Sequence, residues 1–211
     1  MLGFNLPENY LKDCSISSIN GLICVAIEEK DLFLWNPSIR KLKKLPDYET
    51  SYVFSYGFEY DELHDDYKVV GIIRSVRDIY SHSDVGKIYS LNNNSWSCLD
   101  DFQTGIPFMK PGMFVNGKLH WAITTKRFRY NNYWDIIFVD LANEKLGEIE
   151  KPMDGEGNFV YMSCLSVLGN DLSTFSSQLI SHLDLWVMKD TGLNNLGQRY
   201  LPSNILMISW A

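Results

Sequence analysis

The run Gly112–Lys118 fits the phosphate-binding pattern G-x-x-x-x-G-K. Such a loop binds phosphate because a following Ser or Thr binds magnesium and a helix then presents its backbone N–H groups. Here Leu119 follows, and the chain continues to Ile123 as a strand-like run. We interpret the segment as a β-hairpin turning at Asn116-Gly117, because Asn-Gly accepts the positive φ angles of a tight turn. No cofactor is expected.

The acidic segment Asp61–Asp66 and the four histidines are the residues that could bind a metal. A calcium loop beginning at Asp61 needs Gly at its sixth position and a carboxylate at its twelfth, where this chain has Asp66 and Ile72. The spacing of the histidines does not fit a zinc site; they are His64, His82, His120 and His182. We interpret the acidic segment as a solvated turn between strands and expect no metal.

Catalytic patterns are weak in this sequence. It contains no Gly-x-Ser-x-Gly motif to expose a nucleophilic serine. Adjacent carboxylates such as Asp100-Asp101 are no evidence of a glycosidase, because catalytic pairs are recognised by their separation in space. We therefore expect a protein that is not an enzyme. The alternative is a hydrolase or sugar-active enzyme on the same fold, which a concave pocket with two converging carboxylates would favour.

Two segments have the composition of a protein-binding surface. Residues Lys126–Trp134 combine cations with aromatic rings, the residue types enriched at interface hot spots, and functional residues often lie on loops. A second, weaker candidate is a loop over Arg74–Lys87. The candidate partner-binding residues are Arg127, Phe128, Arg129, Tyr130, Tyr133, Arg74 and Arg77. The alternative is that Phe128 and Trp134 are core residues at strand ends.

The basic run Arg40–Lys44 stands out in an acidic chain, whose net charge is −7 and whose pI is about 5.1. Short charge runs usually keep a surface solvated, so we interpret it as a solvated turn. A localisation signal or a phosphate-binding patch is the alternative. Nucleic acid is not an expected partner, because its binding requires a basic face that displaces counterions.

Composition favours an all-β protein with a core. Of the 211 residues 45% are hydrophobic and 14% aromatic, which excludes a disordered chain and favours strands, on which aromatic rings pack well. Cys24 and Cys164 lie in apolar runs and are expected to be buried free thiols. No apolar run approaches ~20 residues, and no cationic-then-apolar leader begins the chain. We expect no membrane partner and a cytoplasmic or nuclear location.

One pattern recurs about every fifty residues: an apolar run, an acidic or Asn-rich turn, and the start of a second strand. Taking Trp35, Tyr89, Phe138 and Trp186 as equivalent gives intervals of 54, 49 and 48 residues, close to the ~50 of a kelch-type blade. The repeat predicts an all-β fold of antiparallel, kelch-like β-propeller blades, incomplete or truncated because the fourth unit looks unfinished. A helical signal is confined to Leu196–Met207.

These repeats carry segments that resemble, in order, the plant F-box-associated domain. The segments are Ser18–Cys24, Leu34–Lys41 with Leu45-Pro46, Tyr56–Asp61, Asp65–Val70, Ile88–Leu91 with Ser95-Trp96, Val115–Trp121, Asp140–Lys145 and Asp184–Lys189. The resemblance covers about residues 18–190, and we treat residues 1–211 as a single domain in which 191–211 form a divergent C-terminal tail. It implies a protein–protein recognition module that presents a substrate to an SCF-type ubiquitin ligase for protein ubiquitination.

The resemblance also implies partners. Similar proteins include F-box/kelch-repeat proteins and pollen S-locus F-box proteins, so the partner is an unknown protein substrate, which is a ribonuclease if the chain is S-locus-like. The Skp adaptor and cullin are expected only if the parent protein contains an F-box, because the seventeen residues ahead of the resemblance do not look like one. A third alternative is a truncated, non-functional fragment with exposed sheet edges.

Overall fold

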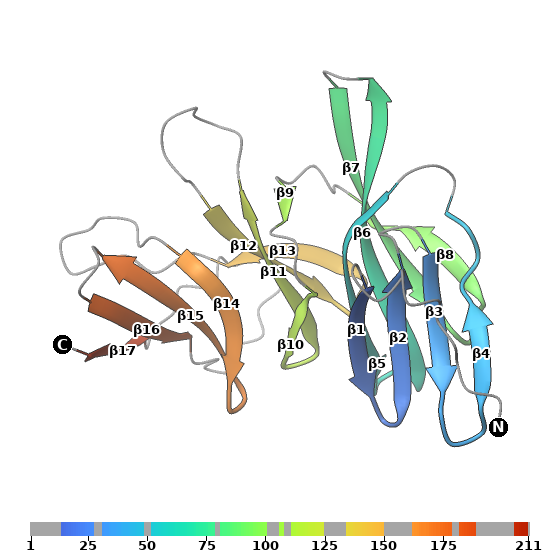
Figure 1. Ribbon diagram of the computed structural model, residues 1–211, viewed down its shortest axis with the longest axis horizontal. Helices are drawn as coiled ribbons and strands as arrows, with labels where there is room; N and C mark the ends of the chain where they lie inside the picture. The colour runs from blue at the N-terminus through green and yellow to red at the C-terminus, as the bar shows by residue number, and fades with distance from the viewer. Residues whose placement is uncertain are drawn as a thin grey trace. The chain divides into compact units, whose positions relative to one another are not determined.

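The computed structural model describes residues 14–27, 31–48, 52–78, 81–100, 106–107, 111–124, 134–149, 162–178, 182–188 and 205–210. These residues form seventeen strands joined by turns, and none of them lies in a helix. The described part of the chain accordingly has no helix long and apolar enough to cross a membrane. The predicted all-β class is confirmed (Figure 1).

The described strands make four antiparallel sheets, each with neighbouring strands in chain order. Blade 1 contains β1 (Cys14–Ile19), β2 (Leu22–Ile27), β3 (Asp31–Asn36) and β4 (Lys41–Lys44). Blade 2 contains β5 (Tyr52–Asp61), β6 (Asp66–Asp78), β7 (Ser81–Ser90) and β8 (Ser95–Cys98). Blade 3 contains β10 (Met113–Val115), β11 (Lys118–Thr124), β12 (Trp134–Asp140) and β13 (Lys145–Ile149), with β9 (Ile106–Pro107) also beside β11. Blade 4 contains β14 (Met162–Leu168), β15 (Asp171–Gln178), β16 (His182–Met188) and β17 (Ile205–Trp210). Four-stranded up-and-down sheets of this kind are propeller blades.

The aromatic-centred repeat corresponds to one strand of each blade. Trp35 lies on β3, Tyr89 on β7, Phe138 on β12 and Trp186 on β16, which are the third strands of the four blades. The roughly fifty-residue interval is therefore the length of one blade and its connection to the next. The prediction that the four aromatic residues lie on equivalent strands of successive sheets is confirmed.

The register corrects one of the four equivalences by a single residue. Asn36 pairs with Lys41 across a four-residue turn, as Asp140 pairs with Lys145, so the equivalent of Trp35 in blade 3 is Val139. Phe138 is one residue earlier and faces the opposite side of its sheet. Its ring covers Gly147, where an added Cβ would clash with the ring.

Blade 4 contains a fourth strand, so the expectation of an unfinished last unit is wrong. β17 pairs with β16 from Leu183↔Trp210 to Met188↔Ile205. The helical signal over 196–207 is also wrong at its end, because residues 205–207 belong to this strand. The segment ILMISW is apolar and partly β-branched, which suits a strand paired in a sheet.

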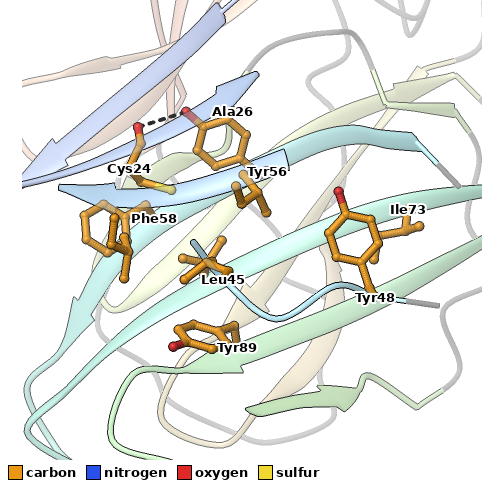
Figure 2. Close-up of a cluster of buried hydrophobic side chains, with 11 residues drawn as sticks. Cys24, Ala26, Leu45, Tyr48, Tyr56, Phe58, Ile73 and Tyr89 are labelled. Atoms are coloured by element: carbon orange, nitrogen blue, oxygen red, sulfur yellow. Dashed lines mark hydrogen bonds between the residues drawn. The ribbon is translucent and has the colours of Figure 1, made fainter. Parts of the chain in front are cut away.

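The described contacts divide the chain into two compact units, one with blades 1 and 2 and one with blades 3 and 4. In the first unit the two blades pack face to face through a core of buried aliphatic and aromatic side chains, which are Cys24, Ala26, Leu32, Leu34, Leu45, Tyr48, Tyr56, Phe58, Val69, Ile73 and Tyr89 (Figure 2). In the second unit the corresponding core contains Val115, Ala122, Trp134, Ile136, Leu165, Leu172 and Met188.

Two polar aromatic groups join blades 1 and 2. The Tyr56 hydroxyl donates to the backbone carbonyl of Ser15 at 2.7 Å. It also lies 3.3 Å from the carbonyl of Cys24 (Figure 2). The Trp96 indole N–H donates to the carbonyl of Pro46 at 2.8 Å. Buried Tyr and Trp need such partners for their polar atoms, so these bonds fix how the two blades meet.

Cys24 and Cys164 are both free thiols, as expected, but only Cys24 is fully buried. Cys24 is fully buried, and burial raises the pKa of its thiol far above the ordinary value. Cys164 is only half-buried; it lies beside a register shift on β14, the first strand of blade 4.

The turns have the backbone angles that their residues predict. Asn116 and Gly117 have φ angles of 51° and 77°, which confirms the Asn-Gly hairpin and excludes a phosphate loop followed by a helix. The four-residue turns of the first three blades each end on a residue in the left-handed region; these residues are Arg40, Asp65, Asn94 and Glu144. Asn and Asp tolerate this region better than long side chains do.

This geometry makes a prediction at Arg40, whose φ angle is 52°. Replacing Arg40 with Asn is expected to raise the free energy of unfolding by about 0.5–1 kcal/mol, because Asn enters the left-handed region more easily. Urea unfolding monitored by Trp fluorescence measures the change. Lys41→Asn is the control: Lys41 lies on a strand, where Asn is unfavourable, so a gain of equal size there would contradict the explanation.

Candidate functional site: the loop end of the blades

The two ends of blades 2 and 3 differ in how they are built. In an up-and-down sheet the first and third connections lie at one end, and the second connection lies at the other. In blades 1 to 3 the first end is closed by short turns, at residues 20–21, 37–40, 62–65, 91–94, 116–117 and 141–144. We call it the turn end and the opposite end the loop end.

Backbone and side-chain hydrogen bonds close the turn end. The N–H of Leu91 donates to the carbonyl of Tyr67 at 3.0 Å, and that of Leu141 donates to Gly117 at 3.1 Å, so the turns of one blade are joined to each other. Asp140 Oδ1 accepts from the N–H groups of Ala142 and Asn143, as Asn36 Oδ1 does in blade 1.

The acidic segment is a structural part of the turn end. Asp61 and Lys68 form an ion pair at 2.9 Å with side chains only 3% and 5% exposed, and His64 Nδ1 lies 2.7 Å from the same carboxylate. Burial raises the pKa of Asp61, but the bonds from Lys68 and His64 outweigh it and hold the pKa below its usual value. The carboxylate therefore stays ionised to hold its turn, which confirms the interpretation as a turn between strands.

The carboxylates of Asp65 and Asp66 also accept hydrogen bonds from residues of blade 2. Asp66 accepts from the Ser90 hydroxyl at 2.6 Å and from the N–H of Asn92 at 3.0 Å, which joins the two turns of blade 2. The Tyr60 hydroxyl donates to the Asp65 carboxylate, which raises the pKa of Tyr60 to about 12. Among the described residues, no three His, Cys, Asp or Glu side chains are grouped as they would be to hold a metal.

At the loop end of blade 3, the predicted cationic and aromatic segment connects β11 to β12. Thr124 pairs with Trp134 at its base, so the connection leaves the sheet at the loop end. Trp134 is 3% exposed and belongs to the core, which confirms for this residue the alternative that it is a core residue at a strand end. The other candidates lie outside the described residues; they are Arg127, Phe128, Arg129, Tyr130 and Tyr133.

At the loop end of blade 2, the expected loop over 74–87 is instead a long hairpin. Arg74 is the last β6 residue paired with β5, and Lys87 is the first β7 residue paired with β8. Between them β6 and β7 pair only with each other among the described strands, and this two-stranded ribbon, residues 75–84, rises past the rest of the blade (Figure 1). Val76 suits a strand, and Arg77 lies at a register shift in the ribbon. The backbones of both candidate arginines thus belong to the hairpin.

The candidate residues therefore belong to two loop-end features, a connection in blade 3 and the β6–β7 hairpin in blade 2. Each feature is described within its own unit. Arg, Tyr and Phe side chains on such segments can bury apolar area and donate hydrogen bonds to a polypeptide. Sequence patterns missed that Arg74 and Arg77 lie on strands, although the β-branched residues before Arg74 were a signal that β6 extends this far.

Four up-and-down blades place this chain in the β-propeller class. Comparison with known proteins then gives the family: the model described as "F-box associated beta propeller domain" matches residues 5–206. The chain belongs to this family, which confirms the resemblance seen in its motifs.

The relatives are F-box proteins of Arabidopsis thaliana. F-box/kelch-repeat protein At3g23880 is 33% identical over 84% of this chain and 49% of its own length. F-box protein At4g22390 is 31% identical over 82% and 48%, and F-box protein CPR1 is 28% identical over 82% and 48%. The chain thus spans about half the length of the curated relatives it matches. The solved structure of YjhT superposes with a TM-score of 0.59 at 9% identity, covering 94% of this chain and 64% of that one, which supports the fold alone.

Proposed function

We propose that this chain is the substrate-recognition part of an SCF-type ubiquitin ligase and that it binds its protein substrate at the loop end of its blades. Membership of the F-box-associated family supports the role in ubiquitination. The substrate is a protein, and a ribonuclease if the chain acts as S-locus F-box proteins do. The Skp adaptor and cullin are partners only if the parent protein contains an F-box. The proposed location is the cytoplasm or nucleus.

The observation that carries the proposal is the difference between the two ends of the blades. The turn end of blade 2 uses its acidic groups to hold its own turns, as the Asp66–Ser90–Asn92 bonds show. The loop end has the projecting ribbon of residues 75–84 and the Arg- and Tyr-containing connection between β11 and β12. Binding residues are commonly found on the loops of a rigid scaffold, so the loop end is the better candidate surface.

The test replaces Arg127, Arg129 and Tyr130 together with Ala. The chain is joined to an F-box segment, expressed in plant cells, and proteins carrying the ubiquitin remnant are compared by mass spectrometry. We expect a set of proteins to be ubiquitinated with the wild-type chain and to lose at least about 90% of that signal with the triple variant, because each lost hot-spot residue costs about 1–2 kcal/mol of binding.

The control changes the opposite end of the same blade. Asn143→Ala with Lys145→Ala alters two exposed side chains of the β12–β13 turn and is expected to leave the ubiquitinated set unchanged. Loss of the set with this control but not with the triple variant would place recognition at the turn end. Identical sets for all three proteins would refute recognition through residues 127–130.

A further inference from the structure

The turn between β3 and β4 exposes two large apolar side chains beside two cations. Ile39 is 60% exposed and Leu42 is 44% exposed. Arg40 and Lys41, which lie between them in the chain, are also exposed. We call residues 39–42 the basic turn. It lies at the turn end of blade 1, whereas substrate recognition is assigned above to the loop end.

The backbone of this turn does not require these side chains. The equivalent turns of blades 2 and 3 also contain four residues and also end in the left-handed region, at Asn94 and Glu144. Where blade 1 has the exposed Ile39, blades 2 and 3 have Asn93 and Asn143, as expected of a solvated turn. At this position of the third connection, an apolar side chain is therefore found in blade 1 and not in blades 2 and 3, although the first turn of blade 2 also exposes an apolar residue, Leu63.

The residue equivalent to Leu42 shows the same contrast. Trp96 holds this position in blade 2, where it packs against Tyr48 and Tyr89 and donates to Pro46. In blade 1 the side chain of Leu42 remains close to half exposed. The basic turn thus presents apolar area that is still available for burial.

Of the four cations in residues 40–44, Lys43 and Lys44 interact with neighbouring side chains, whereas Arg40 and Lys41 have no ion-pair partner in the described part of the chain. Lys44 binds Asp31 at 3.0 Å and Asp47 at 3.1 Å, and the Lys43 ammonium lies 5.8 Å from the centre of the Tyr89 ring. Arg40 and Lys41 form no ion pair with any residue in the described part of the chain. Four cations minus the two carboxylates leave a local charge of +2 on a chain whose net charge is −7.

The backbone of Arg40 also lies in the left-handed region, as that of Glu144 does in blade 3. Its φ angle of 52° is unfavourable for a long side chain, and blade 2 has Asn at the same position. Strained backbone positions are concentrated at functional surfaces. Keeping an Arg here sacrifices stability and retains a cation at the tip of the turn.

We propose that the basic turn is a second protein-binding surface and that it binds an extended, acidic segment with alternating apolar residues. Opposite charge attracts the segment to Arg40 and Lys41, and apolar residues of the segment cover Ile39 and Leu42. β4 is the last strand of its sheet and its outer edge pairs with no described strand, so an extended segment can add beside it. Lys41 and Lys43 share one face of β4 and Leu42 lies on the other, which matches alternation of acidic and apolar residues.

The proposal is tested with a fluorescent peptide of alternating Glu and Leu, titrated with the folded chain at physiological salt and followed by anisotropy. The variant Arg40→Glu/Lys41→Glu is expected to bind at least about tenfold more weakly, because two attractions become repulsions. Ile39→Ser/Leu42→Ser is expected to bind about fivefold more weakly at unchanged charge, through loss of apolar burial. Circular dichroism checks that each variant is folded.

The matched control is Lys145→Glu, since Lys145 holds in blade 3 the register position that Lys41 holds in blade 1. This control and the loop-end triple variant are both expected to bind the peptide as the wild type does. The proposal is overturned if the charge reversal at 40 and 41 leaves the affinity unchanged. It is equally overturned if a Lys-Leu peptide binds as well, or if single-stranded RNA binds the basic turn more tightly than the acidic peptide does.

Discussion

Replacing Lys68 with Met is expected to lower the free energy of unfolding by about 3–5 kcal/mol, because it leaves the buried carboxylate of Asp61 without its cation. The ion pair joins the end of β5 to the start of β6 at 2.9 Å, with both side chains almost fully buried. The remaining bond from His64 comes from a half-exposed ring and replaces little of the lost interaction. Urea unfolding of the variant and the wild type measures the loss.

A double variant separates the ion pair from packing. Lys68→Met with Asp61→Leu removes both charges, so it is expected to lose less stability than Lys68→Met alone, although the turn also loses the bond from Leu63 N–H to Asp61. If the stability lost in the double variant equals the sum of the losses in the two single variants, Lys68 and Asp61 are not coupled, and the explanation is contradicted.

The same carboxylate gives the protein a pH dependence. Because the pKa of Asp61 is lowered in the fold, its stabilisation is complete above the ordinary carboxyl value of about 3.9 and disappears as pH falls through the lowered pKa. Asp61→Asn is therefore expected to flatten the fall in stability below about pH 4. If the free energy of unfolding falls equally steeply with pH in the variant and the wild type, other carboxyl groups cause the acid unfolding.

Replacing Tyr89 with Ala is expected to cost about 3–5 kcal/mol, since it empties a large space in the core between blades 1 and 2. The side chain is fully buried, its ring lies 5.3 Å from that of Trp96, and its hydroxyl donates to Asn94 at 3.0 Å. Loss of the cooperative transition in thermal unfolding of the first unit is the expected observation.

Tyr89→Phe is the matched control for this cavity. It keeps the ring and removes only the bond to Asn94, so the expected loss is about 0.5–1.5 kcal/mol. If Tyr89→Phe were as damaging as Tyr89→Ala, the hydroxyl bond rather than the packing would hold the blades together.

The blade repeat could be predicted from the sequence because its signals are local. Asn116-Gly117 predicts a turn from two residues, and the aromatic spacing predicts successive blades. The sequence does not show that Val139, and not Phe138, is the equivalent of Trp35. Ile136, Ile137 and Val139 are all fully buried, so the side chains of this strand do not alternate between buried and exposed. Pairing across the turn with Lys145 decides it.

Features that depend on distant pairing were missed. The ribbon of residues 75–84 has no fixed signal in its sequence, because Ser, Asp and Arg among its β-branched residues suggest a loop, and only the pairing of β6 with β7 reveals two strands. β17 was missed since its partner strand lies on the far side of residues 189–204.

The site was predicted only in part for a different reason. The motifs that carry the family resemblance, such as Leu45-Pro46 and Ser95-Trp96, pack blades 1 and 2 together through the Trp96 bond to Pro46. Residues that maintain the fold therefore identify the family, while the loop-end residues that would choose a partner have no fixed pattern to recognise.

Hydrogen–deuterium exchange of the chain with and without a bound substrate tests recognition at the loop end most directly. The account predicts slower exchange over residues 125–133 and in the ribbon at 75–84, with no change at the turns of residues 62–65 and 116–117. Slower exchange at those turns, with residues 125–133 unaffected, would contradict it.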